Sequence, residues 1–479
     1  MAHTEFILMR IHPLPLSLVL GLATALTPVL AHAQNTGQDG DAQPAPFTHP
    51  DGSAFTTDEK IDALQAQLNT LKSQRDLDQE LADKAAAKTP VATLDKKGLK
   101  FVSADGKYEL DINAQVNIDA RNYGSGASAG SDDVFARLIR PTISGRAGNA
   151  FFKVTPEFAG SSVSSASLVD GYIGYKFSNA AQIQAGKFKS PIGLERLQSA
   201  ADILFTERGH STNLVPNRDS GVQLSGNLIP NVLEYQLGVF DGATDNANIA
   251  NDSDNQKDVA YRIFATPFSQ SGAVWLQGFG IGWAGSTGKH LGNATTTQLP
   301  SYKTPGQLTF FKFASGAFAN GKETRSNPEA YFYLNNFGLL ADYVEAKQQV
   351  ANAVKSAELT QRALDVSGSW VLTGESVGFK GGVKPAHDFN PKNGGWGALE
   401  LVARYGYTDI DNAAFTDGFA SISSAASKAT STGVGLSWYW SENVKWLLDY
   451  DQTKFKGGAA AGADRADEKF TSAAIQFRY

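Results

Sequence analysis

Basic side chains between residues 137 and 218 stand at positions whose chemistry suits the binding of anions. An arginine can form two parallel hydrogen bonds with a carboxylate or phosphate group, whereas a lysine supplies a mobile point charge. Such cations attract an anion most strongly where they face a narrow, partly dry path. The candidate anion-binding residues are Arg137, Arg140, Arg146, Lys153, Lys187, Lys189, Arg196, Arg208 and Arg218.

A hydrolytic site is the competing chemistry for the same region. Glu207, His210 and Ser211 supply the residue types of a catalytic triad, but neighbours within one loop seldom reach triad geometry. The chain has no cysteine, which excludes disulfides, thiolate nucleophiles and cysteine-based metal sites. We therefore expect no enzymatic activity, no cofactor and no metal. The net charge of −6 gives no indication of a nucleic-acid partner.

The elements that would position these cations begin near Leu99, where apolar and polar residues start to alternate and continue to do so up to Tyr479. Residues 108–123 form the clearest stretch, with Leu110, Ile112 and Val116 on one face and polar residues on the other. Strands of soluble proteins are usually shorter. The pattern fits an all-β, antiparallel transmembrane barrel, with lipid outside and water inside. At roughly 22–26 residues per strand and connection, it predicts about 16 strands. A soluble sandwich or propeller is the alternative.

One long segment, Gly186 to Gly221, interrupts this alternation. Loops of this length are usually functional or disordered, and apolar residues such as Ile192 and Leu214 favour an ordered one. We interpret residues 186–221 as a loop that folds into the barrel and narrows a pore. A packed surface loop is the alternative, because acidic residues directly adjoin three of its arginines and could neutralise them.

The start of the chain carries an export signal. Arg10 and His12 precede an apolar run from Leu14 to Leu30, and Ala-His-Ala follows at residues 31–33. This is the pattern of a secretory signal peptide over residues 1–33. It predicts export, and with the barrel it predicts a place in the outer membrane of a Gram-negative bacterium, in contact with its lipid.

A helical segment separates the signal from the barrel. Residues 34–57 are polar and rich in Pro, Gly and Asp, which is typical of a flexible linker. Over residues 58–89, Ile61, Leu64, Leu68 and Leu71 follow the spacing of a heptad seam. This predicts a short coiled-coil helix that self-associates, or else one amphipathic helix that packs elsewhere. Residues 90–98 are expected to be a second linker.

Several stretches of the barrel region resemble the phosphate-selective porin O/P family of Gram-negative outer membranes. The resemblance is spread from about residue 99 to the end of the chain and lies in GKFKSPIGLE (186–195), FTERGHSTNLVPNRDSGVQL (205–224), KDVAYRIFATPF (257–268), SGSWVLTGE (367–375), GALELVARYGYTDID (397–411) and GLSWYWSENVKWLLDY (435–450). The family implies a 16-stranded homotrimeric porin with inward-folded loops. Basic residues that line its channel attract small inorganic anions, phosphate among them.

The second barrel strand departs from the family pattern. The family commonly carries a pair of arginines where this chain has FARLIRP (135–141), so that Leu138 stands in place of one of them. Arg137 and Arg140 would face opposite sides of a regular strand, unless a bulge near Pro141 turns both inward. The thinner basic set leaves phosphate selectivity open. We expect passive diffusion of small anions, with a general, cation-conducting or neutral-solute porin as the alternative and an envelope-tethering barrel as a more distant one.

Overall fold

The computed structural model describes residues 53–86, 89–124, 130–160, 166–248, 252 and 254–479. The predicted signal peptide and nearly all of the first predicted linker lie outside these residues. The chain divides into two compact units, residues 1–83 and residues 84–479. Each unit is described by itself.

The first unit contains most of helix α1 (Thr57–Ala86). A capping box starts the helix: the Thr56 amide donates to the Glu59 carboxylate at 2.8 Å, and the Glu59 amide donates to the Thr56 hydroxyl at 3.5 Å. The predicted helical segment, 58–89, therefore begins one residue after the first residue of α1 and ends three residues after its last. Leu64 and Leu71 of the heptad seam are exposed. The coiled coil itself stays a prediction. None of the described helices is long and apolar enough to cross a membrane.

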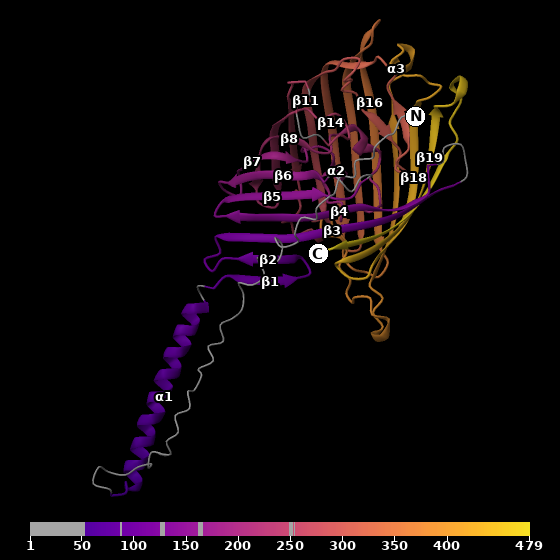
Figure 1. The fold of residues 1–479 in the computed structure, drawn as a ribbon. Coiled ribbons are helices and arrows are strands. Elements are labelled where there is room, and N and C mark those ends of the chain that lie inside the picture. Colours follow the sequence, from indigo (N-terminus) through magenta and orange to yellow (C-terminus); the bar gives the residue numbers. More distant parts are fainter. Residues whose placement is uncertain (1–52, 87–88, 125–129, 161–165, 249–251, 253) are drawn as a thin grey trace, which may run out of the picture. The chain divides into compact units, whose positions relative to one another are not determined.

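The second unit is a closed antiparallel barrel of sixteen strands, which confirms the predicted fold class (Figure 1). Each strand pairs with its neighbour in the barrel, and β20 pairs with β3, from Phe470 opposite Tyr123 to Arg478 opposite Gln115. Closure satisfies the backbone groups that lipid could not. The strands are β3 (Tyr108–Tyr123), β4 (Asp133–Ala147), β5 (Ala150–Glu157), β6 (Ser167–Lys176), β7 (Gln182–Phe188), β8 (Asp219–Ile229), β9 (Leu233–Phe240), β10 (Asp258–Ala265), β11 (Phe279–Leu291), β14 (Phe318–Leu334), β15 (Phe337–Ala351), β16 (Ser356–Val371), β17 (Ala398–Asp409), β18 (Ala426–Tyr439), β19 (Val444–Gly457) and β20 (Glu468–Arg478).

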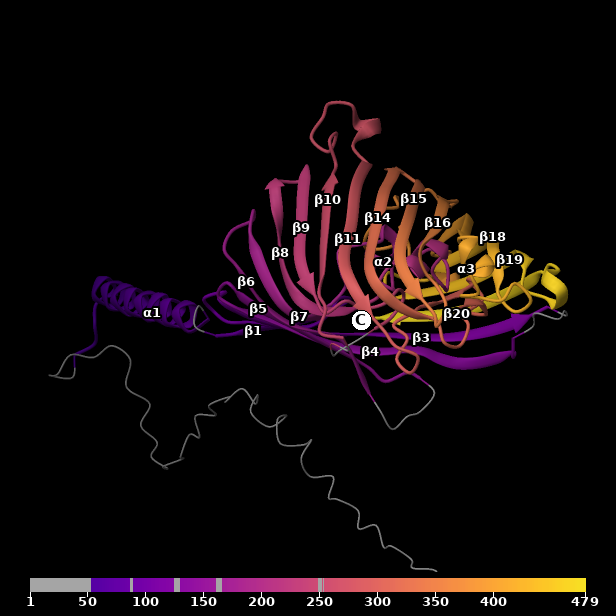
Figure 2. The same cartoon turned by 90° about the horizontal axis from the view of Figure 1, so that it is seen from above.

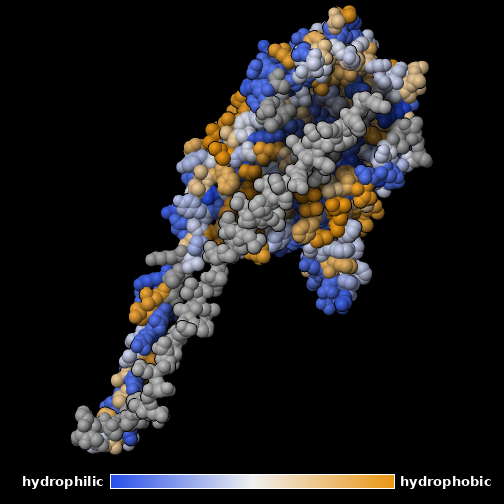
Figure 3. Space-filling view, viewed as in Figure 1, coloured by the Kyte–Doolittle hydropathy of each residue, from blue (hydrophilic) through white to orange (hydrophobic). Residues whose placement is uncertain are grey.

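The alternation along each strand separates the lipid face from the lumen. On β17, Leu401 and Tyr405 are exposed on the outside, whereas Glu400 and Arg404 are buried on the inside. Apolar side chains accordingly gather over the outer wall (Figure 3). Polar side chains on the inside can meet water or one another. This arrangement is the one expected of a membrane barrel and excludes the soluble sandwich or propeller.

A short hairpin extends the wall at one end of the barrel. It consists of β1 (Val91–Asp95) and β2 (Gly98–Val102), so residues 90–98 hold a strand and a turn rather than the predicted linker. The lower part of β3 pairs with β2 from Glu109 to Ile112, and its upper part pairs with β20. The β1–β2 hairpin and the chain's last strand therefore share one edge of β3.

Connection lengths distinguish the two ends of the barrel. Five of the connections on the side where β3 begins are short, such as 148–149, 230–232 and 335–336. The opposite side carries longer connections, including 189–218 and 292–317. Short turns are periplasmic and long loops extracellular in outer-membrane barrels. By this rule β3 begins, and β20 ends, at the periplasmic end. Two longer periplasmic connections, 266–278 and 372–397, are exceptions.

Asn443, in the β18–β19 turn, ties the shared edge together. Its side-chain amide donates 2.7 Å hydrogen bonds to the carbonyls of both Lys96 and Arg478. We predict that Asn443→Ala lowers the stability of the barrel by about 1–3 kcal/mol, the usual effect of losing such bonds. The folded band on a gel should convert to the unfolded band at a temperature several degrees lower. Asn149→Ala, an exposed asparagine in the β4–β5 turn, is the matched control. Equal midpoints for the two variants would contradict this role.

Candidate functional site

The long connection after β7 folds into the lumen of the barrel, as the sequence predicts. It contains the short helix α2 (Leu194–Leu197) and the 3-10 helix η1 (His210–Leu214), and Figure 2 shows α2 enclosed by the curved strands. Ile192, Leu214 and Val215 are at most 1% exposed and pack against apolar residues of the wall. Burial of these side chains holds an otherwise polar segment inside the barrel. Residues 189–218 are called the lumen loop below.

Buried carboxylates on three strands anchor the lumen loop by accepting its donors. The Ser211 amide donates to Asp365 on β16, and the Ser211 hydroxyl donates to Asp342 on β15 at 3.1 Å. The Thr206 amide donates to Asp449 on β19 at 2.7 Å. These contacts fix both the position and the orientation of the loop against one side of the wall. Its basic residues are therefore held on a rigid support.

The parts of the hypothetical triad point to separate partners. His210 is fully buried between the hydroxyls of Thr408 (Nδ1, 2.9 Å) and Ser431 (Nε2, 2.7 Å), and burial lowers its pKa to about 3. The Ser211 hydroxyl donates to Asp342, and Glu207 binds Arg137. No nucleophile–base contact exists among these residues, so His210 is a packing and hydrogen-bonding residue.

A second inward-folded connection covers the lumen loop. It contains the hairpin of β12 (Ser301–Lys303) and β13 (Thr309–Lys312). Asn213 of the lumen loop binds the backbone of Lys303 in both directions: its Nδ2 donates to the carbonyl at 2.8 Å and its Oδ1 accepts from the amide at 3.1 Å. This double contact places the Lys303 side chain beside the lumen loop.

These two segments and β4 enclose a cavity of about 180 Å³, which is called the constriction cavity below. Six basic residues line it against one acidic residue, Glu207. The basic residues are Arg137, Arg140, Arg196, Arg208, Arg218 and Lys303. Five of the nine predicted candidates thus meet at one place, although they are spread over more than eighty residues of the sequence.

A β-bulge explains how Arg137 and Arg140 face the same cavity. Asn117 of β3 stands opposite Leu138 and Ile118 stands opposite Ala136, so Arg137 is the extra residue. The bulge therefore occurs at Arg137. The position near Pro141 that the sequence suggested for it is wrong. Pro141 pairs regularly with Ala114. The consequence for the two arginines is the predicted one, because both turn inward.

Carboxylates neutralise three of the six cations. Glu207 receives two 2.8 Å hydrogen bonds from Arg137. Glu157 accepts from Arg140 at 2.5 Å, and Asp170 accepts from Arg218 at 3.2 Å. Each of these ion pairs is an arginine–carboxylate contact with little solvent around it. The carboxylates therefore largely neutralise the positive charge of Arg137, Arg140 and Arg218.

The other three cations have no carboxylate within ion-pair distance in the described structure. Arg196 donates only to the Thr212 carbonyl (2.6 Å) and the Asn246 amide oxygen (2.7 Å). Arg208 donates only to backbone carbonyls, those of Glu195 and Gln198. Burial lowers the pKa of Arg196 to about 9 and that of Arg208 to about 10, so both guanidinium groups stay charged at neutral pH. The Lys303 ammonium has no polar partner in the described part of the chain. The lining of the cavity thus has more positive than negative side chains.

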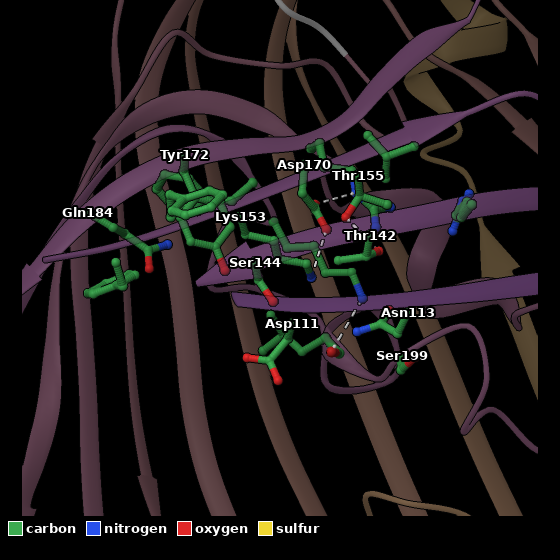
Figure 4. A pocket seen from close by; sticks show the side chains of 18 of the residues that line it. Asp111, Asn113, Thr142, Ser144, Lys153, Thr155, Asp170, Tyr172, Gln184 and Ser199 are labelled. Carbon is green, nitrogen blue, oxygen red and sulfur yellow. Dashed lines mark hydrogen bonds and ion pairs between the residues drawn. The ribbon is translucent and has the colours of Figure 1, made fainter. Parts of the chain in front are cut away.

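A larger cavity, of about 930 Å³, adjoins the constriction cavity toward the periplasmic ends of β3–β9 and is called the chamber below (Figure 4). Arg140 and Arg218 line both cavities and mark the boundary between them. Lys189 also lines the chamber; its Nζ donates to the Leu197 and Gln198 carbonyls at 3.3 and 2.6 Å. Its pKa is well below the usual value because it is buried and lies near Arg208.

The remaining predicted residues lie outside the constriction. Arg146 and Lys153 line the chamber, paired with Glu109 at 3.0 Å and Asp170 at 3.1 Å. Lys187 is buried on β7 and lines neither cavity.

The barrel region matches the family model "Phosphate-selective porin O and P" over residues 104–479. The chain belongs to this family. It is therefore an outer-membrane porin, a channel rather than an enzyme, as the sequence analysis expected. A comparison with curated proteins found no match.

Solved outer-membrane channels share the fold of this porin. The channel DcaP of Acinetobacter baumannii superposes with a TM-score of 0.52 at 12% identity, over 81% of this chain and all of that one. A structure titled "Anion-selective porin from Comamonas acidovorans" gives 0.47 at 10% identity, over 78% of this chain and all of the other. The likeness to DcaP, at 12% identity, extends to the fold alone.

Sequence reasoning missed two lysines of this porin, Lys303 in the constriction cavity and Lys380 in the chamber. Both stand in connections whose composition indicates only loops. Lys303 is brought to the pore by Asn213, ninety residues away. A single sequence contains no signal for that pairing.

Glu207 limits the positive charge of the porin, because it also accepts from Arg121 at 2.5 Å. We predict that Glu207→Gln makes the pore more selective for anions. Arg121 and Arg137 would lose their closer counter-charge and keep only Asp119, at 3.9 and 3.4 Å, which strengthens the field inside a poorly screened site. The reversal potential under a salt gradient should move several millivolts further to the anion side.

Glu345→Gln is the control for this measurement. Glu345 also forms an ion pair, with Arg362 at 2.9 Å, but lines neither cavity. A shift of the Glu207→Gln pore toward cations, or no shift relative to the control, would contradict the role assigned to Glu207.

Proposed function

We propose that this porin conducts small anions by passive diffusion through the constriction cavity. The observation that carries the proposal is the excess of positive charge there: six cations line the cavity, and carboxylates pair with only three of them. Three of those cations, Arg196, Arg208 and Lys303, have no carboxylate partner in the described structure. A cation excluded from water attracts a passing anion far more strongly than one at the surface.

The arrangement of the cations suggests a path with graded attraction. An anion in the chamber first meets Arg140 and Arg218, whose carboxylate partners weaken their pull. It then reaches the unpaired guanidinium groups of Arg196 and Arg208. Arginine forks suit the oxygen atoms of phosphate or another oxyanion, which agrees with the family's description. Binding must also be weak enough for release, and Glu207 serves that need by neutralising Arg137.

Reversal potential in a planar bilayer under a salt gradient tests the proposal. We expect reversal on the anion side, and we expect millimolar or lower phosphate to block the chloride current. The double variant Arg196→Gln/Arg208→Gln should lose most of the selectivity and weaken the phosphate block about tenfold or more, since charge-assisted hydrogen bonds contribute roughly 1.5–3 kcal/mol each.

Arg362→Gln is the matched control, because Arg362 is exposed on β16 and lines neither cavity. Reversal of the wild-type pore on the cation side would reject anion conduction and favour a general or cation-conducting porin. Selectivity that survives in the double variant would show that other residues determine it.

We further propose that the porin assembles as a homotrimer and that α1 contributes a coiled coil to the assembly. The support is the exposed seam of Ile61, Leu64, Leu68 and Leu71. An isolated helix gains nothing from exposed leucines at heptad spacing, whereas a bundle buries them at roughly 1.5–3 kcal/mol per side chain. Most of the stability of a helix in a protein comes from packing of its apolar face against a partner.

The predicted consequence is that Leu64→Asp/Leu68→Asp lowers the temperature at which trimers dissociate by several degrees without changing single-channel conductance. Ala66→Asp/Thr70→Asp is the control, because it adds the same charge outside the seam. Semi-native gel electrophoresis after heating measures both. Equal dissociation temperatures for the two double variants would rule out a contribution of the seam.

A further inference from the structure

The chamber differs chemically from the constriction cavity beside it. Neutral amide and hydroxyl side chains cover much of its wall, on strands β3, β4, β5, β7 and β8 (Figure 4). These side chains are called the neutral lattice below. Its members are Asn113, Thr142, Ser144, Thr155, Gln184 and Gln223.

Strand register arranges the neutral lattice in two groups, one on β3–β5 and one on β7–β8, with β6 between them. Asn113 stands directly opposite Thr142, and Gln184 stands opposite Gln223. The Thr142 hydroxyl lies 3.0 Å from that of Thr155, two strands away from Asn113. Neighbouring strands are about 4.8 Å apart. The lattice therefore offers rows of hydrogen-bonding groups at a spacing that a six-carbon chain can bridge.

Several members of the neutral lattice have unused hydrogen-bonding capacity. In the described structure Asn113, Ser144 and Gln184 make no side-chain hydrogen bond to the protein, although all three line the chamber. The hydroxyl of Tyr172, at the chamber's edge, has no such partner either (Figure 4). Neutral donors and acceptors thus face the chamber without protein partners.

Most charged side chains of the chamber, by contrast, have partners within the protein. Asp170 is held between Lys153 at 3.1 Å and Arg218 at 3.2 Å, and Asp111 lies 3.6 Å from Lys100. Most charges of this wall are neutralised internally, whereas several of its neutral groups are available. Lys189 and Lys380 are exceptions, since neither has a carboxylate within ion-pair distance in the described structure. A solute in the chamber would therefore be recognised mainly by hydrogen bonds with uncharged side chains.

The sizes of the two cavities separate two kinds of solute. An inorganic oxyanion needs only the constriction cavity of about 180 Å³, whereas the chamber measures about 930 Å³, a volume typical of sites for organic ligands. Arg140 and Arg218 join the two compartments. A molecule with an anionic end and a hydroxylated body fits both chemistries at once.

We propose that the solute of this porin is an anionic polyol, such as a sugar acid or a sugar phosphate. Its anionic group enters the basic constriction cavity while its hydroxyl groups exchange hydrogen bonds with the neutral lattice. This inference rests on the proposed anion conduction and adds the class of solute. Hydroxyl groups, and not charge alone, then determine which anions bind well.

The test compares two six-carbon monocarboxylates that differ in their hydroxyl groups, gluconate and hexanoate, as blockers of the chloride current in planar bilayers. We expect gluconate to block at about tenfold lower concentration, the effect of one to three net hydrogen bonds. Equal block, or stronger block by hexanoate, would overturn the inference and leave the chamber as a water-filled vestibule. A wild-type pore that reverses on the cation side would instead reject the proposed function itself.

Variants of the neutral lattice sharpen the comparison. Asn113→Leu/Gln184→Leu should bring the two blocking concentrations to within about twofold of each other. Gln361→Leu is the control, because Gln361 is a buried amide on β16 outside the chamber lining, and it should keep the full preference for gluconate. If the double variant does not fold, Ser144→Ala replaces it and should lower the preference measurably. A preference that persists in the folded lattice variant would also overturn the inference.

Discussion

The attachment of the lumen loop to the β15–β19 side of the wall is the interaction on which the rest of the structure depends. Asp342, Asp365 and Asp449 are almost completely buried, and a buried carboxylate is costly unless donors surround it. The lumen loop supplies those donors through Thr206 and Ser211. The wall and the loop therefore depend on each other: without the loop Asp365 and Asp449 would lose the donors named above and Asp342 would keep Asn327, at 2.6 Å. Without the carboxylates the loop would lose three of its anchors. The division of the lumen into a constriction cavity and a chamber follows from this contact.

That fixed loop explains how the porin can keep uncompensated positive charge inside a barrel. Unpaired guanidinium groups would normally be drawn toward carboxylates or water. Arg196 and Arg208 are instead held by carbonyl and amide oxygens, which orient them without cancelling their charge. Neutral acceptors thus serve as the support and leave the electrostatic field available. Lys303 is held in a similar way: Asn213 binds its backbone and not its ammonium group.

Much of this architecture could be read from the sequence because it depends on local patterns. Alternation set by lipid outside and water inside predicts the strands, and the length of the barrel region predicts about sixteen of them. Features that depend on distant partners could not be read in the same way. The bulge at Arg137 is defined by its register against Asn117 and Ile118, and the β1–β2 hairpin by the free lower edge of β3. Lys187, which lies two residues before the predicted pore residue Lys189, is buried and lines neither cavity.

The two cavities together suggest why a porin would separate charge from neutral hydrogen bonding. A single strongly basic pocket binds every small anion and releases each slowly, because charge is attracted regardless of shape. A neutral surface discriminates by the positions of hydroxyl groups, but it attracts weakly from a distance. The chamber lies next to the constriction cavity, and Arg140 and Arg218 line both. The basic residues can therefore attract the solute, while the neutral lattice distinguishes solutes by their hydroxyl groups. Because neither contact needs to be tight, selection and rapid release become compatible.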